Sequence, residues 1–243
     1  MVDFHSHILP GIDDGSESVA ESLAMLRLSA EQGVTHAVAT PHFYPDQDTP
    51  RKFLRRRDRA ETALRQEMAK HRALPELIMG AEVRFFRGMS EAEELNLLTI
   101  GASPFLLVEM PPVPWSEEMY RELEEIYRKR EITPVIAHID RYLSPLGSRK
   151  SLRRLMELPV LIQANGEFFL NWKTEALAFG MLKAGQIHLL GSDCHNLKTR
   201  KPNLGPALER IVRKLGEEAP EDIRQYEHEI LGVMPCYETE LGV

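Results

Sequence analysis

Short runs of apolar residues recur along the chain and alternate with longer stretches in which apolar positions follow a helical spacing. The runs that read as strands cover residues 2–4, 37–39, 77–79, 105–108, 134–137, 160–162 and 187–190. Continuous apolar runs of this length, bounded by turn residues, are typical of parallel strands that are buried on both faces.

Amphipathic stretches between the runs predict helices. The first begins at Ser18, whose spacing to Glu21 suits a capping box, and it stops at Gly33. The others cover residues 51–70, 116–129 and 204–215. Strands that alternate with helices predict right-handed βαβ units, and about seven such units favour a closed α/β barrel over an open sheet.

Composition narrows the class of protein. The 243 residues suit a single domain, 1–243, with a short irregular tail after about Leu231. The net charge of −7 gives no support for nucleic-acid binding. The two cysteines, Cys194 and Cys236, are too few for a disulfide framework. Without a signal peptide or an apolar run near the ~18 residues of a membrane helix, we expect a cytoplasmic protein that does not insert into membranes.

Metal-binding side chains stand where the apolar runs end. Residues two apart on a strand point the same way, and the carboxyl ends of all strands in a parallel barrel meet at one face. We therefore expect these side chains to converge. They are His5, His7, His42, Glu82, Glu109, His138, Asp193 and His195.

Convergence of this set requires cations. Three carboxylates placed together without metal would repel one another, and their pKa values would rise. Mixed nitrogen and oxygen ligands suit Zn, Mn or Fe. Because eight ligands exceed the needs of one ion, we expect two or three divalent ions, with a carboxylate such as Glu82 bridging. A lone buried histidine or glutamate is more often structural, so the prediction depends on the joint pattern.

Two arginines follow the predicted ligands. Arg141 comes three residues after His138, and Arg200 lies in the segment after His195. A guanidinium group matches the geometry of phosphate oxygens, so arginines beside a metal cluster favour phosphoester hydrolysis. Each arginine taken alone is equally consistent with a surface ion pair.

A competing pattern is the Cys-x5-Arg spacing of Cys194 and Arg200, which cysteine-dependent phosphatases share. The intervening residues include no glycine for a phosphate-cradling turn. Strand alternation also directs Cys194 away from the face of Asp193 and His195. We therefore reject Cys194 as a nucleophile.

Two further features leave alternatives open. The basic stretch Arg51–Arg59 reads as a solvated helix face or as a docking patch for an acidic, phosphotyrosine-rich segment. Aromatic residues that follow predicted ligands could frame a substrate pocket or belong to the core. These are Phe43, Tyr44, Phe85, Phe86 and Trp115.

Several motifs together resemble a known family. Residues 4–15 (FHSHILPGIDDG), 39–42 (ATPH), 80–82 (GAE), 133–141 (TPVIAHIDR) and 192–196 (SDCHN) occur in that order. They are similar to motifs of the polymerase and histidinol phosphatase (PHP) superfamily. Within it they most resemble the bacterial tyrosine-protein phosphatases of the CpsB and YwqE type.

The resemblance implies a distorted (β/α)7 TIM-like barrel with a trinuclear metal site. It implies that His5, His7, Glu82 and Asp193 bind the first ion, that Glu82, Glu109 and His138 bind the second, and that His42 and His195 help to bind the third. It also implies phosphate binding by Arg141 and Arg200, and it makes Asp14 a candidate acid or base near the leaving group.

The expected activity is hydrolysis of phosphotyrosine by a metal-activated hydroxide, in the regulation of capsular or exopolysaccharide synthesis. Manganese is the first choice of metal, with Fe, Zn or Mg as alternatives. The expected partner is a phosphotyrosine-bearing protein, namely a bacterial tyrosine kinase of polysaccharide export. The alternatives are a PHP phosphatase of a small metabolite such as histidinol phosphate, a metal-dependent amidohydrolase, and a non-catalytic metal-binding regulator.

Overall fold

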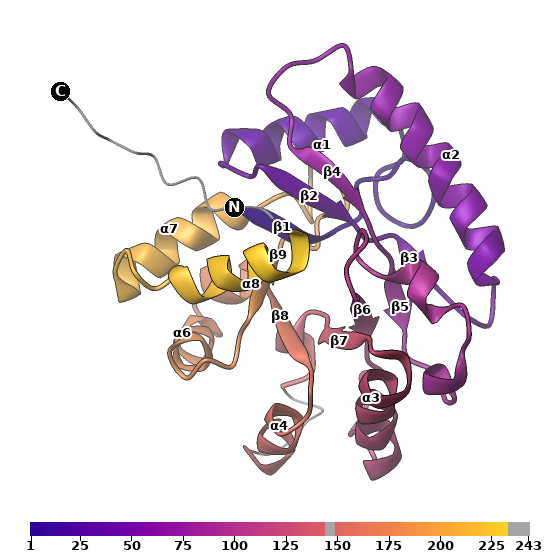
Figure 1. Cartoon of the computed structure of the whole chain (residues 1–243). Helices are drawn as coiled ribbons and strands as arrows, with labels where there is room; N and C mark the ends of the chain where they lie inside the picture. The colour runs from indigo at the N-terminus through magenta and orange to yellow at the C-terminus, as the bar shows by residue number, and fades with distance from the viewer. Residues whose placement is uncertain (144–148, 233–243) are drawn as a thin grey trace.

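The computed structural model describes residues 1–143 and 149–232, and it is built around a curled parallel sheet with helices on the outside (Figure 1). The strands are β1 (Val2–Ser6), β2 (His36–Ala39), β3 (His42–Phe43), β4 (Glu76–Met79), β5 (Glu82–Arg84), β6 (Phe105–Glu109), β7 (Thr133–Ile136), β8 (Leu161–Asn165) and β9 (Leu189–Gly191). The tail expected after Leu231, with Cys236, lies outside the described residues except for Gly232.

Two interrupted strands join the parts of the sheet. Only Thr40 and Pro41 separate β2 from β3, and only Gly80 and Ala81 separate β4 from β5. Because β2 pairs with β4 and β3 pairs with β5, the order β1-β2-β4 continues into β3-β5-β6-β7-β8-β9. These nine strands of the described residues therefore occupy seven positions around the sheet.

The last strand returns to the first. The backbone N–H of Asp193 donates to the carbonyl of His5 at 2.7 Å, and that of His7 donates to the carbonyl of Cys194 at 2.9 Å. The curl of the sheet thus brings β9 beside β1, and all the strand pairs are parallel. The expected fold, a distorted (β/α)7 barrel of the TIM type, is confirmed.

The helices predicted from the sequence are present. The α-helices are α1 (Val19–Glu31), α2 (Pro50–Met68), α3 (Glu117–Arg130), α4 (Arg149–Met156), α5 (Gly166–Leu170), α6 (Glu175–Lys183), α7 (Leu204–Leu215) and α8 (Glu221–Leu231). The hydroxyl of Ser18 accepts from the backbone N–H of Glu21 at 3.2 Å, as expected for its cap. None of the helices in the described part of the chain is both long and apolar enough to cross a membrane.

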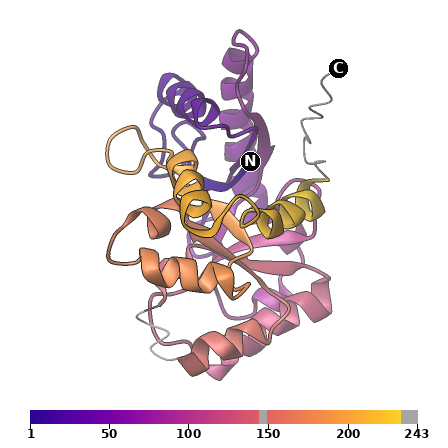
Figure 2. The same ribbon diagram turned by 90° about the vertical axis from the view of Figure 1, so that its left-hand side faces the viewer.

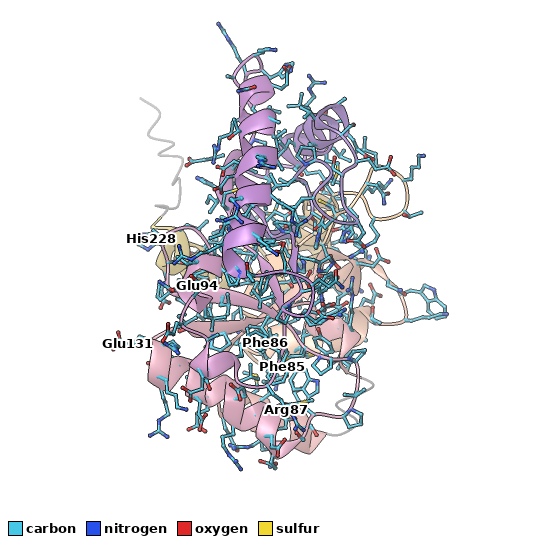
Figure 3. All side chains as sticks on the ribbon, turned by 90° about the vertical axis from the view of Figure 1, so that its right-hand side faces the viewer. Phe85, Phe86, Arg87, Glu94, Glu131 and His228 are labelled. Carbon is cyan, nitrogen blue, oxygen red and sulfur yellow. The ribbon has the colours of Figure 1, made fainter. Side chains whose placement is uncertain are left out.

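The connection from β5 to β6 is the main departure from a regular barrel. Residues 85–104 are all described, and they form two 3₁₀ turns, η1 (Met89–Glu91) and η2 (Leu95–Leu98), instead of an α-helix. This segment begins at Phe85, Phe86 and Arg87, which lie together on the side of the molecule seen in Figure 3. A third 3₁₀ turn, η3 (Ile139–Arg141), follows β7.

The interior of the barrel is apolar below the carboxyl ends of the strands. Phe4 of β1 and Leu107 of β6 belong to one buried cluster, although their strands are not neighbours in the sheet. This cluster therefore spans the interior of the barrel. Figure 2 shows the barrel from the side, with the loop after β9, in light orange, projecting away from α8, in yellow. Catalytic loops of parallel barrels lie at the carboxyl ends of the strands.

Gly191 marks a close approach between β9 and β1. A Cβ atom at this position would lie 2.5 Å from the Cβ of His5 and 2.7 Å from Nε2 of Gln163. The backbone of β9 can therefore pass the first predicted ligand only because residue 191 has no side chain.

We predict that Gly191→Ala destabilises the protein by about 1–3 kcal/mol, because the added methyl group overpacks this contact. The matched control is Gly180→Ala, since a Cβ in that part of α6 meets nothing within 4 Å. The control should stabilise the protein by about 0.5–1 kcal/mol. Urea unfolding measures both changes, and an unchanged midpoint for Gly191→Ala would contradict the packing described.

Candidate metal centre

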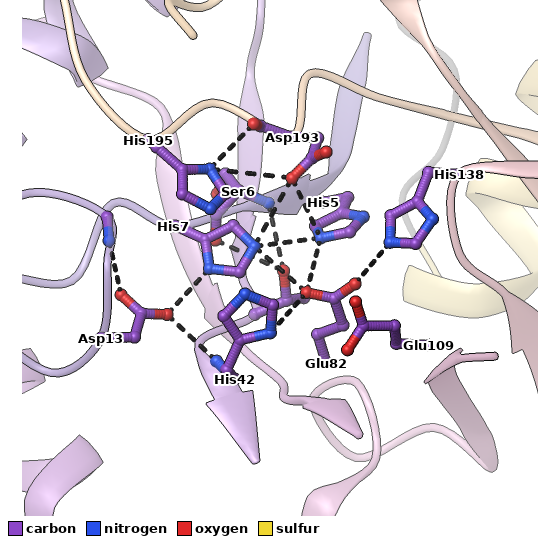
Figure 4. Close-up of polar contacts among 12 residues, drawn as sticks. His5, Ser6, His7, Asp13, His42, Glu82, Glu109, His138, Asp193 and His195 are labelled. Atoms are coloured by element: carbon purple, nitrogen blue, oxygen red, sulfur yellow. Dashed lines mark hydrogen bonds and ion pairs between the residues drawn. The ribbon is translucent and has the colours of Figure 1, made fainter. Parts of the chain in front are cut away.

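The structure brings all eight predicted ligands together at one end of the barrel (Figure 4). Six of them lie at or just beyond the carboxyl end of a strand, and His42 and Glu82 begin the short strands β3 and β5, which follow the interruptions. His5 and His7 come from β1, His42 from β3, Glu82 from β5, Glu109 from β6, His138 from β7, and Asp193 and His195 from β9. The side chains converge as expected from their positions at strand ends. Their roles as metal ligands stay predictions.

Glu82 lies at the centre of the cluster. Its Oε2 atom is 2.9 Å from Nδ1 of His42 and 3.3 Å from Nε2 of both His5 and His7. Its Oε1 atom is 2.8 Å from Nε2 of His138. The residue is 1% exposed, so this carboxylate meets four imidazoles out of contact with water. That position is the one a bridging carboxylate needs.

The ligand atoms fall into overlapping groups of the size that one metal ion requires. Within each group the atoms lie within 4.8 Å of one another. The groups are His5, His7 and Asp193; His42, Glu82 and Glu109; and His7, Asp14, His42 and His195. Nitrogen and carboxylate donors in this mixture suit first-row divalent ions.

Several buried atoms of the cluster lack a hydrogen-bond partner. They are Nδ1 of His42, Oε2 of Glu82, Oε2 of Glu109, Nδ1 of His138 and Nε2 of His195. Some approach one another within ion-pair distance but without the geometry of a hydrogen bond. Buried polar atoms are ordinarily paired, and unpaired ones are costly. Divalent cations would satisfy these lone pairs, so the residues fit a metal centre.

The backbone is strained at two predicted ligands. His138 has φ 33° and Asp193 has φ 52°, in the left-handed region that residues with a side chain rarely adopt. Surrounding contacts hold both conformations, including the hydrogen bond from the His138 N–H to Oε1 of Gln163 at 2.7 Å. Strain of this kind gathers at functional sites.

Asp13 orients the cluster, although the sequence analysis did not single it out. Its Oδ2 atom is 2.8 Å from Nδ1 of His7 and accepts from the backbone N–H of His42 at 3.0 Å. Its Oδ1 atom accepts from the N–H of Gly15 at 3.0 Å. A carboxylate on Nδ1 fixes the tautomer that leaves Nε2 of His7 free for a metal. The signal was its position beside Asp14 in the first motif.

Strand β8 supports the site without supplying a predicted ligand. Oε1 of Gln163 is 3.2 Å from Nδ1 of His5, and Nε2 of Gln163 donates to Oδ1 of Asn165 at 3.1 Å. Asn165 in turn donates from Nδ2 to Oδ2 of Asp193 at 3.1 Å. These two amides link ligands from three strands. Polar residues inside a buried strand were the sequence signal that could have revealed them.

The ionisation of the cluster follows from its charges. Burial alone would lower the pKa of His7, but the hydrogen bond to Asp13 and the negative charges of Asp13 and Glu82 raise it to about 10. Burial would raise the pKa of Glu82, yet the charge of His5 and the hydrogen bond from His138 hold it well below its usual value. In the metal-free protein, protonated imidazoles thus take the place of cations.

His195 has the opposite tendency. Burial, together with the positive charges of His7 and Arg200, lowers the pKa of His195 to about 4. Its Nδ1 atom lies 3.0 Å from the carbonyl oxygen of Asp193, which suits a neutral ring that donates from Nδ1. The Nε2 lone pair is then available to a cation.

The predicted phosphate-binding arginines both reach Asp193. Arg141 donates from Nη2 to Oδ2, and Arg200 donates from Nη2 to Oδ1 at 2.6 Å. Their side chains are 40% and 36% exposed, so they stand at the open edge of the cluster. Asn196 closes the loop around Arg200, because its Oδ1 atom accepts from the backbone N–H groups of Lys198 and Thr199 at 2.9 and 2.8 Å.

Asp14 is more exposed than the ligands around it. Its Oδ1 atom lies 3.4 Å from Nε2 of His42 and 3.4 Å from Nε2 of His195, and its side chain is 65% exposed. The carboxylate therefore reaches both the solvent and the histidines that were expected to hold a third ion.

Cys194 lies outside this arrangement. The residue is fully buried in an apolar cluster with Ile8, Leu9 and Met25. Burial raises the pKa of the Cys194 thiol far above its usual value. A nucleophilic cysteine needs a lowered pKa and access to substrate, so the Cys-x5-Arg spacing is a coincidence.

We predict that metal binding releases protons. The pKa of His7 is about 10 in the metal-free protein, so His7 is protonated there at neutral pH and must lose its proton to bind a metal. The metal-bound state holds fewer protons, so metal affinity should rise with pH. Calorimetric titration with Mn²⁺ at about pH 8, in buffers of different ionisation enthalpy, should show release of about one proton or more per chain. Binding with no proton release would contradict this protonation state.

We also predict that Asp13→Asn weakens metal binding by about 10- to 100-fold, the usual cost of losing a carboxylate behind a ligand histidine. Asp46→Asn is a control, since Asp46 is an exposed acidic residue with no contact to the cluster among the described side chains. Equal metal affinities for the two variants would show that Asp13 does not orient His7.

The chain also matches known proteins. Residues 1–231 match the family of capsular polysaccharide synthesis, CpsB/CapC. The tyrosine-protein phosphatase CpsB of Streptococcus pneumoniae is 31% identical over 237 residues, which cover 92% of this chain and 94% of that protein. The tyrosine-protein phosphatase YwqE of Bacillus subtilis is 28% identical over 229 residues, which cover 90% of this chain and 87% of that protein.

Solved structures share the fold. Crystal structures of YwqE from Bacillus subtilis and CpsB from Streptococcus pneumoniae, described as unique metal-dependent tyrosine phosphatases, include a chain that matches with a TM-score of 0.82 at 24% identity. The match covers 94% of this chain and 93% of that one. A histidinol phosphate phosphatase from Lactococcus lactis matches with a TM-score of 0.55 at 17% identity, over 90% of this chain and 93% of that one. The chain therefore belongs to the CpsB/CapC family of capsular polysaccharide synthesis.

Proposed function

We propose that the chain is a metal-dependent protein-tyrosine phosphatase, a phosphoric monoester hydrolase that acts in capsular or exopolysaccharide synthesis. The observation that carries this proposal is the buried cluster around Glu82, with two arginines at its open edge. Relatives that match nearly the whole chain are tyrosine-protein phosphatases. One cytoplasmic domain, residues 1–243, would contain the entire site.

Two or three divalent ions, manganese in the first place, would occupy the cluster. His5, His7, Glu82 and Asp193 would hold the first ion, Glu82, Glu109 and His138 the second, and His42 and His195 the third. Asp14 lies beside His42 and His195, at the edge of this third position. Such ions supply hydroxide at neutral pH and neutralise charge on phosphoryl oxygens.

The arginines would bind the phosphoryl group. Arg141 and Arg200 already point their guanidinium groups at the Asp193 carboxylate, an anion of similar size to one edge of a phosphate. A phosphoryl group held there would receive hydrogen bonds that oppose the charge developing on its oxygens. This arrangement suits phosphoester hydrolysis better than amide hydrolysis.

The leaving group makes modest demands on the protein. A tyrosine phenolate has a pKa near ~10, so it departs more easily than a serine alkoxide. Asp14, with a side chain 65% exposed, can meet the leaving oxygen and would act there as acid or base. The substrate would be a phosphotyrosine-bearing protein, namely a tyrosine kinase of polysaccharide export.

The test is hydrolysis of a phosphotyrosine peptide before and after treatment with a chelator, with Cys194→Ser beside the wild type. We expect the chelator to abolish activity, Mn²⁺ to restore it, and Cys194→Ser to retain it. Activity that ignores the chelator and disappears in Cys194→Ser would instead identify a cysteine-dependent enzyme.

A further inference from the structure

The structure separates the aromatic residues that follow the predicted ligands. Phe43 and Trp115 are buried in the main apolar core, and Phe85 and Phe86 pack partly buried against it. Tyr44 differs, since its ring stacks on the imidazole of His42, a predicted ligand. In the described part of the chain, Tyr44 is the one of these five aromatic residues whose ring contacts a predicted metal ligand.

Tyr44 joins the metal centre to an exposed arginine. Its ring centroid is 5.1 Å from that of His42, with the planes inclined by only 19°. The guanidinium carbon of Arg84 lies over the same phenol ring, 4.3 Å from its centroid. A planar guanidinium group on an aromatic ring is favourable both as a cation–π contact and as a stack.

Strand geometry places Arg84 beside the ligands. Arg84 comes two residues after Glu82 on β5, so both side chains leave the strand in the same direction. On the neighbouring strand it pairs in register with Glu109. Its Nε atom is 3.7 Å from Oε2 of Glu109, beyond hydrogen-bond distance, and its side chain is 50% exposed. The guanidinium is thus held over the ring of Tyr44 and only loosely by the charge of Glu109.

This position differs from that of the other arginines at the site. Arg141 and Arg200 are engaged with Asp193 through hydrogen bonds, on the side of the cluster formed by β7 and β9. Arg84 stands beside Glu109 and Tyr44, on the side formed by β3, β5 and β6. The centre therefore has oxyanion-binding groups on one side and a half-exposed guanidinium over an aromatic ring on the other.

We propose that Arg84, held over the ring of Tyr44, is a specificity-determining residue that stacks on the phenyl ring of an aryl phosphomonoester bound at the metal centre. The inference rests on the proposed function and deepens it. In an aryl ester the ring begins one oxygen atom away from phosphorus, so it reaches the side chains immediately around the ligands. A phosphoserine has no ring to stack there, and Arg84 favours phosphotyrosine over it.

The test compares two peptides that are identical except for phosphotyrosine or phosphoserine at one position. Arg84→Lys keeps the charge but removes the planar group. We expect it to lower the ratio of kcat/KM for phosphotyrosine to that for phosphoserine by about two- to five-fold, the size of an exposed cation–π contact. The difference in leaving group is the same for both enzymes and cancels in this comparison.

Arg87→Lys is the matched control. Arg87 lies just beyond β5, is 88% exposed and pairs with Glu118 at 3.1 Å, away from the ligands. Its substitution should leave the ratio unchanged. Tyr44→Phe keeps the ring and should preserve the ratio, whereas Tyr44→Leu removes the support for Arg84 and should lower it as Arg84→Lys does. A general disturbance of the metal site would reduce both substrates alike.

Binding provides a readout without turnover. A peptide with a non-hydrolysable phosphonate analogue of phosphotyrosine should bind the Mn²⁺-loaded Arg84→Lys protein about two- to five-fold more weakly, with little change for an aliphatic phosphonate. A wild type that hydrolyses phosphotyrosine, combined with unchanged ratios and affinities in Arg84→Lys and Tyr44→Leu, would overturn the stacking role alone. A wild type inactive on phosphotyrosine would overturn the proposed function, and the phosphonate affinities would still decide the role of Arg84.

Discussion

The carboxylate of Glu82, buried among four imidazole rings, is the interaction on which the rest of the site depends. Removing a carboxylate from water is costly unless positive charge surrounds it. In the metal-free state, protonated histidines such as His7 provide that charge. Metal ions provide the same positive charge when they are bound, and the imidazoles are then neutral. The same burial therefore explains the shifted pKa values, the unpaired polar atoms and the fit to divalent cations.

The barrel holds this costly arrangement in place from several directions. Two neighbouring strand positions are interrupted at Thr40–Pro41 and Gly80–Ala81, beside the site, and they stay paired with each other on both sides of the interruption. Gly191 lets β9 pass close to β1. Asp13 and Gln163 then fix the rings of His7 and His5 by hydrogen bonds to their Nδ1 atoms. Ligand geometry is thus set by groups that would not bind a metal themselves.

Much of this could be predicted from the sequence, because parallel strands place their carboxyl ends together whatever the intervening helices do. The bounds of α7 matched the predicted stretch 204–215, and each predicted ligand reached the cluster. The contact partners of Gln163 and Tyr44 could not be predicted, since they include residues on strands far apart in the chain. Periodicity shows which face of a strand is buried, but not which ring or amide from another strand will meet it.

The number of metal ions that Glu82 contacts is the property that most directly tests its central place in the site. Anomalous scattering from crystals of the Mn²⁺-loaded protein locates each ion and its ligands. We predict two or three ions per chain, with Glu82 in contact with two of them. A single ion that does not touch Glu82, or a fully loaded protein whose ions all lie outside the cluster, would contradict it.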